Sequence, residues 1–303
     1  MTTAPKTPRT TKTTVPKKPA AKRVTKPRAS TKTKQPEPAK RSFAYGPIII
    51  GVLLLILFSP LYYKFVVSGF KGAWHWINDI GEDPDYRNYK SFNIHVSEKY
   101  TIHGIDVSYA QGKIDWPKVK AMDENGLHLT FAFIKATDGV NYIDPTFQRN
   151  WREAAKTGLI CGAYHFFRPE KDGKTQAKWF LKTAKLEPND MPLVVDIEKM
   201  DGVSPEQMRI QLDACLSFLK YRSPVKPIIY SGLSFYTDYL KGYFDEYPLW
   251  IAHYDQPEQR ISQASKWQFW QHSSKATVNG IKHAVDFDTF KGDSVAFRQV
   301  LIQ

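Results

Sequence analysis

Residues 191–198 read Met191-Pro192-Leu193-Val194-Val195-Asp196-Ile197-Glu198. An apolar run ended by two acids is typical of a strand that is buried on both faces of a parallel sheet. Because residues i and i+2 of a strand point to the same side, we expect Asp196 and Glu198 to project together, with their Cα atoms about 6.5–7 Å apart. The stretch therefore predicts a central strand with two neighbouring carboxylates at its C-terminal end.

Strand and helix patterns alternate on both sides of this stretch, from Thr101 onward. Further strands are predicted at Ile102–Ser108, Leu129–Ala136, Leu159–Phe167, Pro227–Ser231, Pro248–Ala252, Trp267–Gln271 and Ala284–Phe287. Helices are predicted at Trp116–Met122, Phe147–Lys156 and Thr175–Leu186, and after the capping box Ser204-Pro205-Glu206-Gln207. This alternation predicts an α/β fold with a parallel, TIM-barrel-like sheet.

Acidic residues stand at the ends of several predicted strands. Asp106 ends the first strand, Asp196 and Glu198 end the fourth, and Asp286 ends the last. Active sites of such barrels collect at the C-terminal ends of the strands. Glycoside hydrolysis needs one carboxylic acid to protonate the leaving oxygen and carboxylate charge to stabilise an oxocarbenium-like transition state. A lone Asp-x-Glu pair is usually a solvated strand end, but acids on partner strands favour a catalytic role here.

Aromatic residues also gather at or near the predicted strand ends. Sugar rings pack their C–H faces on aromatic planes, while Tyr and Trp keep a polar group for hydroxyls. We expect about half of these residues to line a groove and the others to be core. They are Tyr109, Tyr164, Phe166, Phe167, Tyr230, Trp250, Tyr254, Trp267 and Trp270.

Eight short motifs, in order between about Thr101 and Lys291, resemble those of the glycoside hydrolase family 25 lysozymes. They are Gly104-Ile-Asp106-Val-Ser, Phe133-Ile-Lys135-Ala-Thr, Gly162-Ala-Tyr164-His-Phe, Val195-Asp196-Ile-Glu198, Ile229-Tyr230-Ser, Leu249-Trp250-Ile-Ala-His-Tyr254, Trp270-Gln271 and Val285-Asp286-Phe. The resemblance implies an irregular β/α barrel with a long groove. It also implies an N-acetylmuramidase, which cuts between N-acetylmuramic acid and N-acetylglucosamine in peptidoglycan.

The resemblance assigns roles to individual residues. It implies that Glu198 is the general acid and that Asp196 is its electrostatic partner, with Asp106 and Asp286 completing the acidic site. It implies that the sugar-binding cleft is shaped by Lys135, Tyr164, Tyr230, Trp250 and Gln271, to which the aromatic pattern adds Tyr109 and Tyr254. The sequence departs from the family at His272, where Tyr is common, and at His253, a variable position.

The identity of the nucleophile stays open at this stage. The carboxyl separation distinguishes retaining enzymes, at about 5–5.5 Å, from inverting ones, at about 6.5–9.5 Å, and a two-residue strand offset does not choose between them. The substrate's own N-acetyl group is a third possibility, and our hypothesis is that it attacks while Asp196 stabilises it. Two other functions compete with hydrolysis of peptidoglycan, namely a non-catalytic peptidoglycan-binding membrane anchor and a chitinase-like glycosidase. The longer Asp-x-x-Asp-x-Asp-x-Glu pattern of chitinases is missing before Glu198.

The positive charge of the chain is concentrated at its N-terminus. Residues 1–41 hold 13 Lys and Arg and one acid, Glu37, and so carry +12 of the net +13. The other residues balance at 30 basic against 29 acidic, so we expect no nucleic-acid partner for the folded domain. With seven prolines and no aromatic residue, residues 1–41 are predicted to form a disordered basic cytoplasmic tail, either simply solvated or in contact with anionic headgroups or nucleic acid.

A transmembrane helix is predicted at residues 42–63. Ser42–Tyr63 spans 22 positions without a charge, enough to cross the roughly 30 Å hydrocarbon core of a bilayer. A basic leader of this length is too long for a cleaved signal peptide. The excess of basic residues before the span places the N-terminus in the cytoplasm. Residues 64–100 are then a juxtamembrane connector, and residues 101–303 a periplasmic or extracellular catalytic domain.

The two cysteines, Cys161 and Cys215, permit one disulfide, but both stand in apolar patterns that favour buried free thiols. No cluster of Cys or His stands at metal-ligand spacing. We therefore expect no metal and no cofactor. The expected partners are peptidoglycan glycan strands and, through residues 42–63, a phospholipid bilayer.

Overall fold

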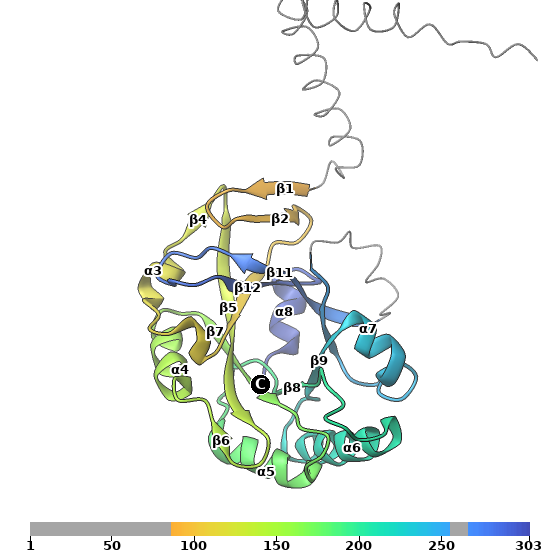
Figure 1. The fold of residues 1–303 in the computed structure, drawn as a ribbon. Helices are drawn as coiled ribbons and strands as arrows, with labels where there is room; N and C mark the ends of the chain where they lie inside the picture. The colour runs from red at the N-terminus through yellow and green to blue at the C-terminus, as the bar shows by residue number, and fades with distance from the viewer. Residues whose placement is uncertain (1–85, 255–265) are drawn as a thin grey trace, which may run out of the picture. The chain divides into compact units, whose positions relative to one another are not determined.

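The computed structural model describes residues 86–254 and 266–303 (Figure 1). The chain divides into two units, Met1–Trp74 and His75–Gln303, and the described residues belong to the second. The predicted tail, the predicted span at 42–63 and the first part of the predicted connector lie outside the described residues. Within the described ranges, no helix combines the length and the apolar character that a bilayer crossing requires.

Eight strands close into a barrel, which confirms the predicted fold class. Apolar β-branched and aromatic runs bounded by Gly, Pro and Asp form these strands, and pairing of the first with the second closes the ring. The sheet order is β3, β12, β11, β10, β9, β8, β7, β5. The strands are β3 (His103–Val107), β5 (Leu127–Asp138), β7 (Ile160–Phe166), β8 (Val194–Asp196), β9 (Ile228–Gly232), β10 (Leu249–Ala252), β11 (Trp267–Ala276) and β12 (Val285–Phe290).

The last strand departs from the predicted parallel sheet. β12 runs antiparallel to both of its neighbours, β11 and β3, whereas the other barrel pairings are parallel. Asp286 is therefore near the start of its strand, and the prediction that it ends the strand is wrong. The reversed direction of β12 nevertheless brings Asp286 to the predicted rim of the barrel, because Asp286 pairs in register with Asp106 at the end of β3.

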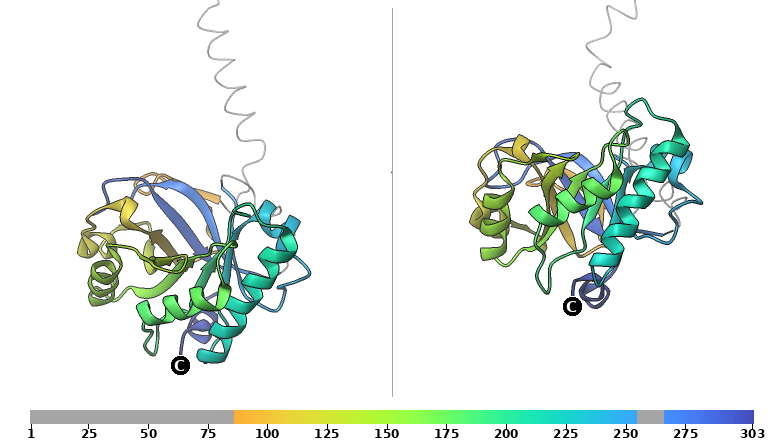
Figure 2. Two further views of the ribbon diagram at one scale, coloured as in Figure 1. Left: turned by 60° about the horizontal axis from the view of Figure 1, so that its bottom comes forward. Right: turned by 90° about the horizontal axis from the view of Figure 1, so that it is seen from below.

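Most of the helices cover the outside of the strands (Figures 1 and 2). Helix α6 begins at the predicted capping box, where the Ser204 side chain accepts a hydrogen bond from the Gln207 amide. The helices are η1 (Tyr109–Gln111), α3 (Trp116–Lys120), α4 (Phe147–Lys156), α5 (Gly173–Thr183), α6 (Pro205–Arg222), α7 (Leu233–Phe235), η2 (Tyr236–Leu240) and α8 (Ser294–Val300). Two short strands, β4 (Asp123–Glu124) and β6 (Tyr142–Ile143), pair with β5.

An aromatic cluster supports the site from inside the barrel. Phe133 stacks on Trp250 with 4.3 Å between ring centroids, and Phe297 of α8 packs on Phe131 and Phe269. Gly162 is needed on β7, because a Cβ there would come within 2.6 Å of the Phe133 ring. The floor under Trp250 is therefore rigid and closely packed.

A second apolar layer lies between the strands and the helices, and it contains both thiols. Cys161 and Cys215 are buried and unbonded, which confirms the predicted free thiols. Burial raises the pKa of the Cys161 thiol to about 12, so it is protonated and unreactive at neutral pH.

A hairpin that the sequence analysis did not predict precedes the barrel. Its strands are β1 (Tyr86–Tyr89) and β2 (Ile94–Ser97), within the range assigned to the connector. Phe92 at its turn is fully buried against Phe287, and its carbonyl accepts from the Thr277 amide at 2.8 Å. This part of the chain belongs to the folded core.

Candidate active site

One cleft at the rim of the barrel collects ten of the eleven residues predicted for the site. Its volume is about 240 Å³, and each of the eight barrel strands, or the segment that follows it, contributes at least one side chain. The lining residues are Asp106, Lys135, Tyr164, Phe166, Asp196, Glu198, Tyr230, Trp250, Tyr254, Gln271 and Asp286.

Strand register explains why residues far apart in sequence meet here. Asp196 pairs with Phe166 on β7 and with Tyr230 on β9, and Tyr230 pairs with Trp250 on β10. Side chains at paired positions of adjacent strands point to the same face of the sheet. The carboxylates and the aromatic rings therefore form one continuous ring around the cleft.

Asp196 and Glu198 have different environments although they are two residues apart. Strand β8 ends at Asp196, which is 6% exposed, and Glu198 lies beyond the strand end with its side chain exposed at the cleft. The Oδ1 atom of Asp196 has no hydrogen-bond partner among the described residues. A buried acceptor without a partner is costly unless a ligand satisfies it, so Asp196 is suited to accept a hydrogen bond from a substrate.

Gln271 connects two tyrosines to a carboxyl group. Its Oε1 accepts from the hydroxyls of Tyr230 at 2.8 Å and Tyr254 at 2.7 Å, and its Nε2 donates to Asp106 Oδ2 at 2.6 Å. The opposite amide orientation would point an oxygen at a carboxyl and the NH₂ group at two phenols, so the network determines the orientation. The amide holds Asp106 in place and lowers its pKa relative to burial alone.

The carboxyl groups raise one another's pKa. Burial and the charge of Asp286 raise the pKa of Asp106 well above its ordinary value, and burial and the charge of Glu198 do the same for Asp196. Burial and the charge of Glu198 raise the pKa of Asp286 to about 6. Crowding several carboxyls in one cleft lets the site hold protons near neutral pH, as acid–base chemistry requires.

Asp288 is a fifth carboxyl that the sequence analysis missed. It is fully buried two residues beyond Asp286 on β12, and it accepts a hydrogen bond from Trp250 Nε1 at 2.8 Å. Burial and the neighbouring carboxyls Asp106 and Asp286 raise its pKa well above the ordinary value, which favours the neutral form. The i, i+2 rule applied to Asp286 could have found it.

Lys135 is held at the cleft by Phe166 and by two charged residues, Asp138 and Arg168, that sequence reasoning did not identify. Its Nζ lies 3.4 Å from Asp138 Oδ2 and 4.6 Å from the centroid of the Phe166 ring. Arg168 binds the same Asp138 through two hydrogen bonds of 2.7 and 3.1 Å. The positive charge of Lys135 lowers the pKa of Asp196 and partly opposes the effect of burial.

Tyr109 is the predicted site residue that the structure does not bring to the cleft. Its side chain is 56% exposed, and its amide donates to Asp144 Oδ2 at 2.9 Å. Of the nine aromatic residues noted in the sequence, five line the cleft, whereas Phe167, Trp267 and Trp270 are buried core. His272, at the position where the resemblance makes Tyr the common residue, is buried, and burial lowers its pKa to about 3.

The cleft therefore combines carboxyls of raised pKa with aromatic walls and one ammonium group. Residues 86–254 and 266–303 contain no group of three or more His, Cys, Asp and Glu side chains arranged to hold a metal ion. Proton transfer and carboxylate stabilisation are what these side chains supply, and aromatic walls suit sugar rings. A barrel with this rim defines a glycoside hydrolase.

Comparison with known proteins identifies the family. Residues 105–281 match the glycosyl hydrolases family 25, and the chain belongs to that family. It is 42% identical to the uncharacterized protein YegX of Escherichia coli K12, over 80% of this chain and 89% of that protein. It is 33% identical to lysozyme M1 of Streptomyces globisporus, over 71% of this chain and 74% of that protein. A solved family 25 glycosyl hydrolase from Bacillus anthracis superposes with a TM-score of 0.61 at 30% identity, over 68% of this chain and 95% of that one.

Proposed function

We propose that this chain is an N-acetylmuramidase that hydrolyses the bond between N-acetylmuramic acid and N-acetylglucosamine in peptidoglycan. The observation that carries the proposal is the convergence of Asp106, Asp196, Glu198 and Asp286 on one aromatic cleft. A pure binding module has no need to confine several carboxyls whose charges repel one another. Relatives named lysozyme support the substrate class.

Glu198 is the proton donor in this proposal. Glu198 is the most exposed of the acidic residues in the cleft, and its carboxyl group lies at the end of a flexible side chain. This carboxyl group can therefore reach a glycosidic oxygen that enters from solvent. Asp106, Asp196 and Asp286 are more buried, and their charges act on the sugar ring or on one another. Glu198 protonates the leaving oxygen as the bond to the anomeric carbon breaks.

The substrate's own acetamido group acts as the nucleophile. The partnerless Oδ1 of Asp196 accepts a hydrogen bond from the acetamido N–H, which steadies the group while its oxygen attacks the anomeric carbon. Water then opens the resulting ring, with Glu198 as the base. Two displacements retain the anomeric configuration, so NMR of the first product should show the β-anomer, and an inverted product would rule this route out.

The same proposal places the enzyme at a membrane. The uncharged segment 42–63 and the basic residues before it support a single-pass anchor with a cytoplasmic N-terminus. The catalytic domain then faces the periplasm or the exterior, where peptidoglycan is located. Protease digestion of intact and permeabilised spheroplasts tests this orientation, because a cytoplasmic domain would be protected in intact ones.

Purified peptidoglycan and chitin, digested in parallel, test the activity. The wild type should release fragments with N-acetylmuramic acid at the new reducing end and should leave chitin intact. Glu198→Gln should release no fragments while its thermal unfolding stays near that of the wild type. Binding to sacculi without any product from the wild type would instead identify a non-catalytic anchor, and cleavage of chitin a chitinase-like enzyme.

A further inference from the structure

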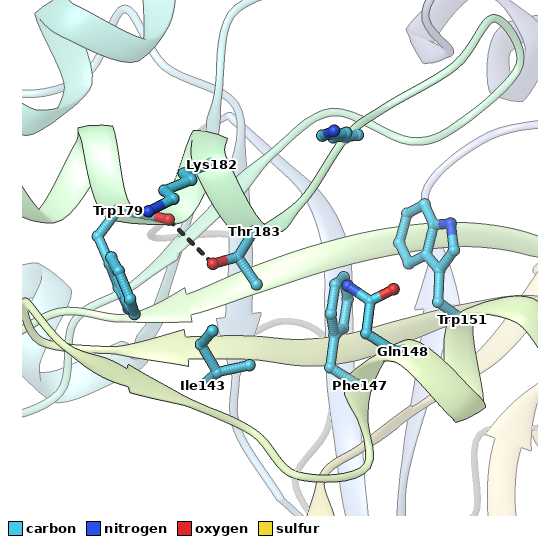
Figure 3. Close-up of a pocket in the computed structure, with 8 residues that line it drawn as sticks. Ile143, Phe147, Gln148, Trp151, Trp179, Lys182 and Thr183 are labelled. Carbon is cyan, nitrogen blue, oxygen red and sulfur yellow. Dashed lines mark hydrogen bonds between the residues drawn. The ribbon is translucent and has the colours of Figure 1, made fainter.

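A second groove lies on the outer surface between α4 and α5. We call it the α4–α5 groove, and its volume of about 500 Å³ exceeds that of the catalytic cleft. Figure 3 shows Trp179 and Trp151 on opposite sides of it, with Ile143, Phe147 and Thr183 between them. The full lining is Ile143, Phe147, Gln148, Trp151, Trp179, Lys182, Thr183 and Lys185.

The two indoles of the groove are held in place but not buried. Trp179 Nε1 donates to the Tyr142 carbonyl at 3.1 Å, which orients the ring, and Trp151 packs against Phe147 with centroids 5.5 Å apart. Both Trp side chains stay partly accessible, and Ile143 is 42% exposed. Apolar side chains that are fixed around an open volume form a surface for binding, because they lose little entropy when a ligand arrives.

The charge of the groove is positive. Lys182 and Lys185 lie on the α5 side, and no acidic residue occurs between Asp172 and Glu187. Neither ammonium group forms an ion pair with a carboxylate of the described part of the chain. The groove therefore suits a ligand that combines carboxylates with small apolar groups.

The groove is connected structurally to the catalytic cleft. Ile143 of the groove lies on β6, which pairs with the end of β5, where Thr137 is its partner. The next pair joins Tyr142 to Asp138, the residue that binds Lys135 of the cleft. One β-hairpin thus contributes to both surfaces.

We propose that the α4–α5 groove binds the acidic peptide stem of peptidoglycan, with its carboxylates at Lys182 and Lys185 and its alanine methyl groups against Trp151 and Trp179. This inference rests on the proposed function, because it requires that the peptide stem is attached to the glycan strand bound in the cleft. Binding of the stem in the groove should make the enzyme prefer peptidoglycan that still carries peptide stems over bare glycan strands.

Charge reversal in the groove provides the test. Lys182→Glu combined with Lys185→Glu should weaken binding of the synthetic tripeptide L-Ala-γ-D-Glu-meso-diaminopimelate by about tenfold or more, as loss and reversal of two ion pairs implies. The matched control combines Lys174→Glu with Lys178→Glu, which changes the net charge equally, at positions on α5. Those two lysines lie 5.7 and 6.0 Å from the Phe218 ring and outside the groove. The control should bind the tripeptide like the wild type.

Two readouts separate failure of this proposal from failure of the proposed function. The tripeptide should shift the indole N–H signals of Trp151 and Trp179 in NMR spectra, assigned with Trp→Phe variants, and stem-free glycan should not shift them. The groove variant should lose the preference for stem-bearing over amidase-stripped peptidoglycan while its kcat/KM on stripped glycan is unchanged.

An active enzyme without tripeptide binding, or with indole shifts caused by glycan instead, overturns the inference. Absence of glycan cleavage by the wild type overturns the proposed function, whereas the tripeptide titration still tests the groove.

Discussion

Trp250 donates its indole N–H to the buried carboxyl of Asp288 at 2.8 Å, directly behind the catalytic cleft. The indole forms part of the cleft wall, whereas Asp288 is fully buried and does not line the cleft. Asp288 is therefore a positioning residue, which acts on a substrate through Trp250. Since burial and nearby carboxyls raise its pKa, it is suited to act as a neutral acceptor.

Substitution of Asp288 tests whether its neutral form is the functional one. Asp288→Asn keeps an uncharged oxygen acceptor for Trp250, so we expect near-wild-type kcat/KM and an unchanged pH profile. Asp288→Leu leaves the indole N–H unpaired and should cost about 1–3 kcal/mol of stability together with a clear loss of kcat/KM. Urea unfolding and initial rates measure both variants. An inactive but stable Asn variant would show that the ionised carboxylate is required.

Asp286 should limit stability at neutral pH. Its pKa is about 6 in the folded protein and near 4 in an unfolded chain, so the folded state holds the proton more tightly. The resulting stabilisation is fully present below about pH 4 and is lost as the pH rises through about 6. Asp286→Asn should thus be more stable than the wild type at pH 7.5, by about 1–3 kcal/mol, and nearly equal to it at pH 4.

Chemical denaturation at the two pH values measures this difference. Asp238→Asn, at an exposed position outside the cleft, is the control and should change stability little at either pH. The Asp286 variant should also lose activity, because residues that serve function at an active site often lower stability. An equal gain in stability at both pH values would mean that the charge of Asp286 is not the cause.

Gln271 should set the protonation of Asp106. Gln271→Leu removes the 2.6 Å hydrogen bond to the carboxyl and the acceptor for Tyr230 and Tyr254. The amide lowers the pKa of Asp106, so its loss should raise that pKa further, and the two unpaired phenols should disorder the cleft. Carbon-13 NMR of the Asp106 carboxyl measures the shift. Gln268→Leu on the same strand, outside the cleft, should leave the titration unchanged, and a similar shift in both variants would contradict the prediction.

The sequence predicted the barrel because its strands and helices have strong local signals. Apolar runs of strand length, caps such as Ser204 and turn glycines act within a few residues, and α4 was predicted with the bounds it has in the structure. The reversed direction of β12 depends on how the ring closes against β3, and no local pattern encodes that. For this reason Asp286 was placed at the correct rim but at the wrong end of its strand.

The candidate site was predictable where chemistry and motif order coincide, as at Asp196 and Glu198. Partners that only orient a site residue escaped prediction. Asp138 stands three residues after Lys135 on one strand, a spacing that local rules do not associate with contact, and Arg168 joins them from after β7. The positions of Asp138 and Arg168 beside Lys135 therefore depend on how the chain packs in three dimensions, not on a local sequence pattern.

The hairpin before the barrel provides the last test, since it precedes the residues that match the family, 105–281. Phe92 is fully buried, packs on Phe287 of β12 and is anchored through its carbonyl to Thr277. Phe92→Ala should therefore destabilise the catalytic domain by about 3–5 kcal/mol, because the cavity lies against a barrel strand. Arg87→Ala removes only an exposed ion pair with Glu98 on the same hairpin and should cost at most about 1 kcal/mol. Thermal and urea unfolding of the full chain measure both variants. Equal, small effects would show that the hairpin is an appendage whose loss the barrel tolerates, whereas a large effect for Phe92 alone would extend the folding unit of the enzyme to this hairpin.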